Sequence, residues 1–274
     1  MIKKIIHISD IHIRNFKRLG EYSEQLSSFI EKCKEEVKDY KYEEVRIVIC
    51  GDLCHQKTTI SPELMVFASS FIRQLEEIGK VIVIAGNHDL IVNNTSRTDA
   101  ITAIFETAQF ENSYFLDMVL EYQSGYVVDE NIVWVVYSIY DDFKKPILDE
   151  VKSQYPNSIY IGLYHGMIVG STLNNGTVVD SGCDGSLFNE CDIVMAGDIH
   201  KRQELKRGDT LIVYPGSLIQ QTFGETITQH GFVVWDIQNN THNYIDLESE
   251  YGLYKFEIKS MYDIDNDDEI LINL

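Results

Sequence analysis

The sequence predicts an α/β fold, and two observations support this prediction. Short apolar segments of strand length alternate with longer segments in which apolar residues recur every three or four positions, the pattern of strands and amphipathic helices. Five of the short segments also end in glycine, aspartate, asparagine or histidine. Because ligands bind outside the carboxyl ends of the strands in an open α/β sheet, we expect these polar residues to share one edge.

The first half of the chain has the pattern strand, helix, strand, helix, strand. The expected strands are residues 4–8, 45–50 and 81–85, and the expected helices are residues 20–39 and 61–79. Ser61 and Pro62 are typical of a helix start, as N-cap and first-turn proline, and Gly79 is typical of a helix end. Crossover connections of this length predict that the three strands are parallel.

The second half supplies more strands than helices. The expected elements are a short helix at 100–108, a strand at 132–137, a helix at 146–155, strands at 159–164 and 193–196, and hairpin strands at 211–213, 232–235 and 244–247. Glycine and asparagine in residues 207–209 and 239–240 predict the turns. We expect one domain over residues 1–250. Residues 251–274 are expected to begin a following capping domain or to form an acidic tail, with the chain truncated there.

Composition and charge exclude several classes of protein. The 274 residues include 23 Lys and Arg and 43 Asp and Glu, which gives a net charge of −20 and counts against diffuse electrostatic binding of nucleic acid.

No apolar run approaches the length of a membrane span and no signal-peptide pattern is present. We therefore expect a cytoplasmic protein, in the host cytoplasm if a phage encodes it, with no membrane partner. The five cysteines predict neither a disulfide framework nor a zinc knuckle.

The polar ends of the five apolar segments are candidate metal ligands. These residues are Asp10 and His12, Asp52 after Gly51, Asn87 and His88 after Gly86, His165, and Asp198 and His200 after Gly197. Extended backbone would present Asp10 and His12 on one side, because side chains alternate. Mixtures of Asp, Asn and His suit manganese, iron or zinc. Asp52 is the natural bridge between two ions, since a carboxylate has two oxygens.

This inventory indicates phosphoester hydrolysis. Two metal ions about 3.5–4 Å apart can clamp the attacking and leaving oxygens of an in-line displacement at phosphorus. The chain has no Gly-x-x-x-x-Gly-Lys loop for a nucleoside triphosphate and no nucleophile elbow for a serine hydrolase. Five cations follow the motifs and are candidates for substrate contact, although solvated surface charge is an equal alternative for each: Arg14, Lys17, Arg18, Lys201 and Arg202.

In their order, these blocks resemble those of the calcineurin-like metallophosphoesterases. The matching segments are Asp10-x-His12, Gly51-Asp52, Gly86-Asn87-His88-Asp89, His165-Gly166 and Gly197-x-x-His200. Within that superfamily the chain most resembles the SbcD-type nuclease subunits of DNA double-strand-break repair and recombination, particularly their bacteriophage relatives. The segments that carry this closer resemblance are Gly51-Asp52-Leu53-Cys54-His55, Asn93-Asn94 with Arg97-Thr98-Asp99-Ala100, Tyr214-Pro215-Gly216-Ser217, and Gln221-Thr222-Phe223-Gly224-Glu225.

The resemblance implies a four-layer α/β/β/α metallophosphoesterase sandwich and two divalent metal ions. Manganese is the expected ion, with magnesium, iron or zinc as alternatives. It also implies exonuclease and endonuclease activity on DNA beside an SbcC-like ATPase subunit, and a homodimer formed through the helices at 61–78 and 99–108.

Carried over position by position, the resemblance assigns roles to individual residues. Asp10, His12, Asp52 and His200 would hold the first metal, and Asp52, Asn87, His165 and Asp198 the second. His88 would assist at the scissile phosphate. Asp89 would either orient His88 or cap loop amides. His55 would help to place the DNA end.

The fifth block departs from the family pattern at Asp198, where the family usually has histidine. A carboxylate can ligate the same ion and favours manganese or magnesium over zinc, and the alternative is a weakened or empty second site. Two other functions remain open. The chain could be a metal-dependent phosphatase or phosphodiesterase that acts on a small-molecule or protein phosphoester, or a scaffold that only presents helices to a partner.

Overall fold

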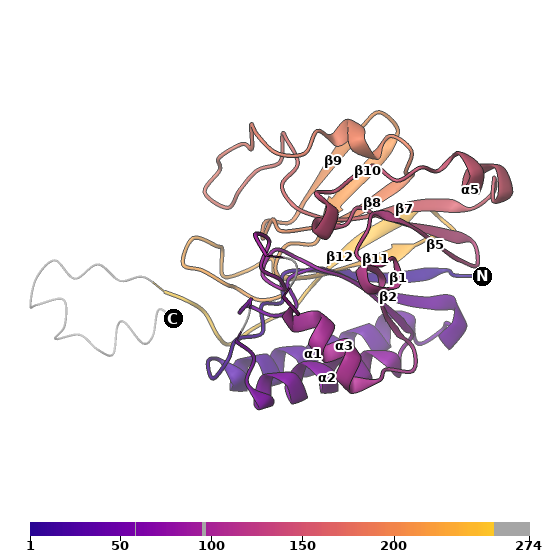
Figure 1. Ribbon diagram of the computed structural model, residues 1–274. Coiled ribbons are helices and arrows are strands. Elements are labelled where there is room, and N and C mark those ends of the chain that lie inside the picture. The colour runs from indigo at the N-terminus through magenta and orange to yellow at the C-terminus, as the bar shows by residue number, and fades with distance from the viewer. Residues whose placement is uncertain (58, 95–96, 255–274) are drawn as a thin grey trace, which may run out of the picture.

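Two six-stranded sheets lie face to face in the computed structural model, which describes residues 1–57, 59–94 and 97–254 (Figure 1). The strand order is β12-β11-β1-β2-β3-β4 in the first sheet and β5-β6-β7-β8-β10-β9 in the second. Helices flank the pair of sheets, so the predicted α/β sandwich is confirmed. Beyond residue 254, the segment expected to start a capping domain or tail lies outside the described residues.

The first sheet and its three longer helices follow the predicted order, and β4, η1 and α4 are additional elements that were not predicted. Their bounds are β1 Lys4–Ile8, α1 Leu19–Val37, η1 Tyr42–Glu44, β2 Val45–Cys50, α2 Pro62–Glu76, β3 Lys80–Ile84, α3 Ala100–Ala108, β4 Ser113–Phe115, α4 Leu116–Val119, β11 Gly231–Asp236 and β12 Thr241–Asp246. As predicted, β1, β2 and β3 are parallel, and the Ser61 side chain caps α2 by accepting from the Leu64 N–H at 3.2 Å. Within the described part of the chain, no helix is both long enough and apolar enough to cross a bilayer.

The second sheet and its connections contain elements that the sequence did not predict and one helix that it placed differently. The elements are β5 Gly125–Asp129, β6 Ile132–Val136, η2 Ile139–Asp141, α5 Asp149–Gln154, β7 Ile159–His165, η3 Gly185–Phe188, β8 Ile193–Gly197, β9 Gln203–Arg207 and β10 Thr210–Tyr214. Strand β5 and the short helices η2 and η3 were not predicted, and β9 supplies the first strand of the hairpin whose turn was predicted at 207–209. The helix expected at 146–155 begins only at Asp149, because Leu148 is buried in the outer core as the N-cap residue.

Three apolar layers hold the sandwich together. Ile6 of β1 packs toward the layer of α1, α2 and α3, which lie together on one side of the first sheet (Figure 1). Its neighbour Ile5 packs between the two sheets with Trp134 and Trp235. A third cluster covers the outer face of the second sheet. Most strands are buried on both faces, so their sequences are continuous apolar segments. The polar residues are concentrated where the strands end.

A buried ion pair joins the two sheets near the start of β2. The Arg46 side chain is fully buried and donates two hydrogen bonds to the Asp129 carboxylate of β5, from Nε to Oδ2 at 2.7 Å and from Nη2 to Oδ1 at 2.8 Å. Trp134 donates its indole N–H to the same carboxylate at 3.2 Å. The pair lies at the end of β2 opposite to Gly51. A guanidinium in this position requires its partner, because an unpaired buried charge is strongly destabilising.

We therefore predict that Asp129→Ala lowers the free energy of unfolding by about 3 kcal/mol, since the buried Arg46 guanidinium loses its bidentate partner and keeps only the longer contact to Glu130 at 3.8 Å. Urea denaturation monitored by circular dichroism measures the loss. Asp129→Asn keeps hydrogen-bond acceptors for Arg46 and should cost less. A loss within about 0.5 kcal/mol for Asp129→Ala, the range of an ordinary surface substitution, would contradict the assigned role.

Candidate metal centre

The carboxyl ends of five strands meet at one edge of the sandwich. β1, β2 and β3 reach it from the first sheet, and β7 and β8 reach it from the second. Backbone hydrogen bonds join the loops that follow. The Asp10 N–H donates to the Gly51 carbonyl at 3.2 Å, the His12 N–H to the Asp52 carbonyl at 2.9 Å, and the Gly166 N–H to the Gly197 carbonyl at 3.2 Å. The candidate ligands are thus gathered between the two sheets.

Close approach of these loops depends on two glycines. Gly51 has φ +82°, and a Cβ on it would lie 2.3 Å from the His165 ring. A Cβ on Gly86 would lie 2.2 Å from a carboxylate oxygen of Asp52. Any side chain at either position would displace a candidate ligand. These two glycines therefore have the role that their sequence context predicts, which is to let the loops pack against one another.

The conformation of the first loop differs from the prediction. Asp10 and His12 have φ values of 54° and 52°, in the left-handed region rather than the extended region. Asp52 and Asp198 also have positive φ, at 55° and 89°. Left-handed backbone is uncommon for residues with a Cβ and is concentrated at functional sites. The extended prediction for Asp10 and His12 was wrong because pairing with the Gly51 loop, rather than strand continuation, sets the backbone here.

The Asp52 carboxylate lies between two groups of candidate ligands. Its Oδ2 is 3.4 Å from Nε2 of His12, and its Oδ1 is 3.4 Å from Nε2 of His165. The carboxylate is 2% exposed. One oxygen therefore faces each group, which is the arrangement required of a bridging ligand.

The first group contains Asp10, His12 and His200. Nε2 of His200 lies 3.1 Å from Nε2 of His12 and 3.6 Å from Oδ1 of Asp10. Together these three residues place one potential ligand atom each within 4.8 Å of one another, close enough to hold a metal ion.

The second group contains Asn87, His165 and Asp198 beside Asp52. The Asn87 side-chain nitrogen donates to Oδ1 of Asp198 at 2.7 Å, which leaves the amide oxygen of Asn87 available as a ligand. Nε2 of His165 is 3.8 Å from the same Asp198 oxygen. Asp198 thus lies within this group.

Two histidine nitrogens in the cluster fit a cation. Nδ1 of His165 donates to the Cys50 carbonyl at 2.7 Å, so a neutral ring turns the lone pair of Nε2 toward Asp52. This buried Nε2 has no hydrogen-bond partner among the described residues. In His200, Nδ1 donates to Glu225 at 2.8 Å, and Nε2 again faces the cluster. A divalent cation binds ligand atoms that carry no proton and point toward a common centre. The Nε2 atoms of His165 and His200, together with the neighbouring carboxylates, can meet this requirement.

The pKa values reflect the same concentration of buried acids and imidazoles. Burial raises the pKa of Asp10 to about 6, against the opposing effect of His200 and His165. Burial lowers the pKa of His200, but Glu225 and Asp10 outweigh it and raise the value to about 9. The pKa of His165 is likewise raised well above its usual value because Asp52 outweighs desolvation. Bound cations would take the place of these protons.

The sequence analysis missed the role of Glu225. Its buried carboxylate accepts from Nδ1 of His200 at 2.8 Å, from the Ser217 hydroxyl at 3.0 Å and from the Gln221 N–H at 2.8 Å. It therefore fixes the ring orientation of His200, in the manner of carboxylates that support metal-bound histidines. The available signal was the segment Gln221–Glu225, which carries part of the resemblance to the SbcD-type nucleases.

Of the two roles considered for Asp89, the structure favours loop capping. The fully buried carboxylate accepts from three backbone N–H groups, those of Asp52 at 2.8 Å, Gly86 at 2.9 Å and Cys54 at 3.0 Å. The His88 ring instead donates from Nδ1 to the His55 carbonyl at 2.9 Å. Asp89 is therefore a positioning residue for the loops that carry Asp52 and His88, which corrects its placement among the catalytic residues.

His55 and His88 lie together against His12. The rings of His55 and His88 are stacked with centroids 5.0 Å apart, and the His88 centroid is 4.8 Å from that of His12. Arg14 lies 2.9 Å from Nε2 of His55 and can only donate, so Nδ1 of His55 carries the proton. Burial and the Arg14 charge lower the pKa of His55 to about 4, which keeps this ring neutral.

Three of the five candidate substrate cations have partners within the protein. Arg18 binds Glu21 through two contacts of 2.6 Å, and Arg202 pairs with Asp246 while lying over the Tyr244 ring. Arg14 contacts His55 and Gln221. Substrate contact stays a prediction for all five, Lys17 and Lys201 included.

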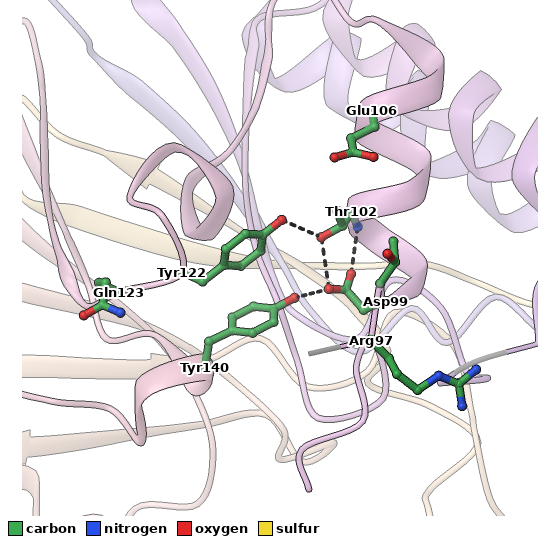
Figure 2. Close-up of a pocket in the computed structure, with 8 residues that line it drawn as sticks. Arg97, Asp99, Thr102, Glu106, Tyr122, Gln123 and Tyr140 are labelled. Carbon is green, nitrogen blue, oxygen red and sulfur yellow. Dashed lines mark hydrogen bonds between the residues drawn. The ribbon is translucent and has the colours of Figure 1, made fainter. Parts of the chain in front are cut away.

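Two hollows in the surface differ in their relation to the metal cluster. One, of about 300 Å³, opens beside the cluster and is lined in part by Asp198, His200 and Asn174. Another, of about 370 Å³, shares no residue with the cluster, and Figure 2 shows its lining around Asp99. There Asp99 caps α3 by accepting from the Thr102 N–H at 2.7 Å, and it also accepts from the Tyr140 hydroxyl at 2.7 Å. Of these two hollows, the first is therefore the one lined by candidate metal ligands.

Comparison with known proteins agrees with this geometry. A family model described as the calcineurin-like phosphoesterase superfamily domain matches residues 4–240. An uncharacterized protein of Acanthamoeba polyphaga mimivirus is 36% identical over 92% of this chain, which spans only 18% of that protein's length. A subunit of the nuclease SbcCD from Staphylococcus epidermidis is 28% identical over 86% of this chain and 67% of its own. A solved archaeal phosphodiesterase is 16% identical, covering 89% of this chain and 99% of its own, with a TM-score of 0.39.

We predict that Glu225→Gln weakens manganese binding by about 10- to 100-fold, because the His200 ring loses its charged partner. Isothermal titration of the metal-depleted protein measures the affinity. Glu204→Gln is the matched control, since Glu204 also pairs with a histidine, His242 at 3.0 Å, but lies outside the cluster. Equal affinities for the two variants would contradict the role of Glu225. Thermal unfolding without metal separates this effect from general destabilisation.

Proposed function

The chain belongs to the calcineurin-like phosphoesterase superfamily and is a metal-dependent phosphoester hydrolase, and we propose that its substrate is DNA, which it cleaves as an exonuclease and endonuclease. The observation that carries the proposal is the position of Asp52, with one oxygen facing each of two ligand groups. A site for two cations suits displacement at a phosphodiester.

In this proposal, eight ligand positions are filled by seven residues. Asp10, His12, Asp52 and His200 hold one cation, and Asp52, Asn87, His165 and Asp198 hold the other. When bound, the cations polarise the phosphoester and make water nucleophilic near neutral pH. The additional carboxylate at Asp198 favours manganese or magnesium over zinc, because harder ions prefer oxygen ligands.

His88 is the proposed proton carrier. Since its Nδ1 donates to the His55 carbonyl, Nε2 is the atom that can hold a proton and deliver it to the leaving oxygen. His55 stacks on this ring and restricts its orientation. Arg14, beside His55, is placed to contact a phosphate of the substrate.

Two observations bear on the choice of DNA. The SbcCD nuclease subunit from Staphylococcus epidermidis is a relative over most of this chain, and cations accompany the loops around the site. The net charge of −20 instead favours the second candidate, a phosphatase or phosphodiesterase acting on a small-molecule or protein phosphoester. A purely scaffolding role is disfavoured because the full set of candidate ligands is assembled.

The same resemblance extends the proposal to partners. We propose an SbcC-like ATPase subunit, a role in DNA repair and recombination, a location in the cytoplasm, and a viral origin of the bacteriophage type. A homodimer through α2 and α3 also stays a prediction. Val66 on α2 is 70% exposed and is available for such a contact, which light scattering at micromolar concentration can check.

Metal content tests the ligand assignment. We predict two manganese ions per chain after loading and desalting, because Asp198 supplies a working ligand where the family usually has histidine. Inductively coupled plasma mass spectrometry gives the count. Asp198→Ala should retain about one ion. A count near one for the unaltered chain would contradict the second site and favour the weakened-site alternative.

Activity assays test the substrate. We predict manganese-dependent cleavage of single- and double-stranded DNA, and a loss of about 10²- to 10⁴-fold in kcat for His88→Ala, the usual contribution of a positioned proton donor. A gel assay on labelled DNA and a chromogenic phosphodiester are run side by side, with EDTA as the metal-removal control. Turnover of the small ester without any DNA cleavage would favour the second candidate. Unchanged activity in His88→Ala would contradict the role of His88, and no turnover of either substrate by the unaltered chain would favour the scaffold.

A further inference from the structure

Two phenylalanine side chains are exposed beside the metal centre. Phe16 is 71% exposed and Phe223 is 64% exposed. Isolated exposed apolar residues are common on protein surfaces and need no explanation. The loops of these two residues adjoin the candidate metal centre, because the loop of Phe16 follows His12 and the loop of Phe223 contains Glu225, which holds His200.

The two loops are fixed to one another. Nη2 of Arg14 donates to the side-chain oxygen of Gln221 at 3.3 Å. Nη2 of Arg18 donates to the Gln220 carbonyl at 2.7 Å while the same guanidinium binds Glu21. Both phenylalanines therefore project from anchored backbone on neighbouring loops. Because the backbone that carries the two rings is already ordered, little loop ordering is needed when a ligand binds.

The surroundings indicate what these rings can bind. Lys17, next to Phe16, is exposed, and Thr222 and Gly224 on either side of Phe223 line the hollow that contains His200. A ligand that fits must therefore reach the metal centre, carry negative charge and present flat apolar faces. A nucleic acid strand has all three properties, since every base has a face on which an aromatic ring can stack.

We propose that Phe16 and Phe223 stack on bases of single-stranded nucleic acid that enters the metal centre, while Lys17 contacts its phosphates. The inference rests on the proposed function and deepens it by assigning how the strand is recognised. It also explains how a chain with a charge of −20 can hold a polyanion, because stacking does not depend on net charge.

The test compares a fluorescent single-stranded oligonucleotide with one of the same length whose central nucleotides are abasic. Binding is measured by anisotropy with manganese present, in a His88→Ala background that prevents turnover. We expect this background protein to prefer the oligonucleotide with bases. Phe16→Ala and Phe223→Ala should each reduce that preference by about 5- to 100-fold, the usual effect of removing one stacking ring. Substitution by tryptophan should preserve it.

Two controls separate stacking from other effects. Lys17→Ala removes a charge adjacent to Phe16 and should weaken binding of both oligonucleotides equally. Ile147→Ala removes another exposed apolar side chain, 82% exposed, outside the two loops and should change neither affinity. Thermal unfolding confirms that each variant is folded.

The outcomes are distinguishable. Binding of both oligonucleotides with equal affinity, or a base preference that survives both phenylalanine substitutions, overturns the stacking inference and leaves the proposed nuclease in place. No binding of either oligonucleotide, together with turnover of bis(p-nitrophenyl) phosphate by the unaltered chain, overturns the proposed function and this inference with it.

Discussion

The convergence of loops on the Asp52 carboxylate is the constraint on which the rest of the structure depends. A 2%-exposed carboxylate with imidazole nitrogens 3.4 Å from each oxygen requires strands from two sheets to end at the same place. That requirement explains the glycines at positions 51 and 86, where any side chain would collide with a candidate ligand. It also explains the left-handed backbone at Asp10, His12 and Asp52, because tightly paired loops leave no room for extended chain.

A second set of residues holds the candidate ligands without being one of them. The Asp89 carboxylate accepts hydrogen bonds from three backbone N–H groups of the loops, and the Glu225 carboxylate fixes the orientation of the His200 ring. Both are buried carboxylates, and each is accommodated because several donors satisfy its oxygens. Preorganisation of this kind lowers the cost of assembling a metal site, since ligands that are already oriented need not be ordered when cations bind.

The sequence predicted the strands that carry the site because each is an apolar segment that ends in a glycine or polar pair. It missed β4 and β5, which lie at the sheet edges, because β4 has only 3 residues and β5 is half-buried along its length, so the apolar pattern of both is weak. The contacts of Glu225 could not be predicted, because His200 lies 25 positions away and only the folded chain brings the two together. The same reason applies to Arg202, whose partner Asp246 is on β12. Local pattern identifies candidate ligands, but tertiary pairing decides which charges remain available.

The identity of residue 198 has an electrostatic consequence for the substrate. With Asp10, Asp52 and Asp198 the cluster contains three carboxylates, whereas histidine at position 198 would leave two. Two bound dications would then have one net positive charge instead of two, so the centre attracts a phosphate less strongly while holding hard cations more firmly. If the substrate is DNA, as proposed, a chain with a charge of −20 and a less positive centre gains affinity for this polyanion from contacts that do not depend on charge. Stacking on the exposed rings of Phe16 and Phe223, the contact proposed above, would be of that kind.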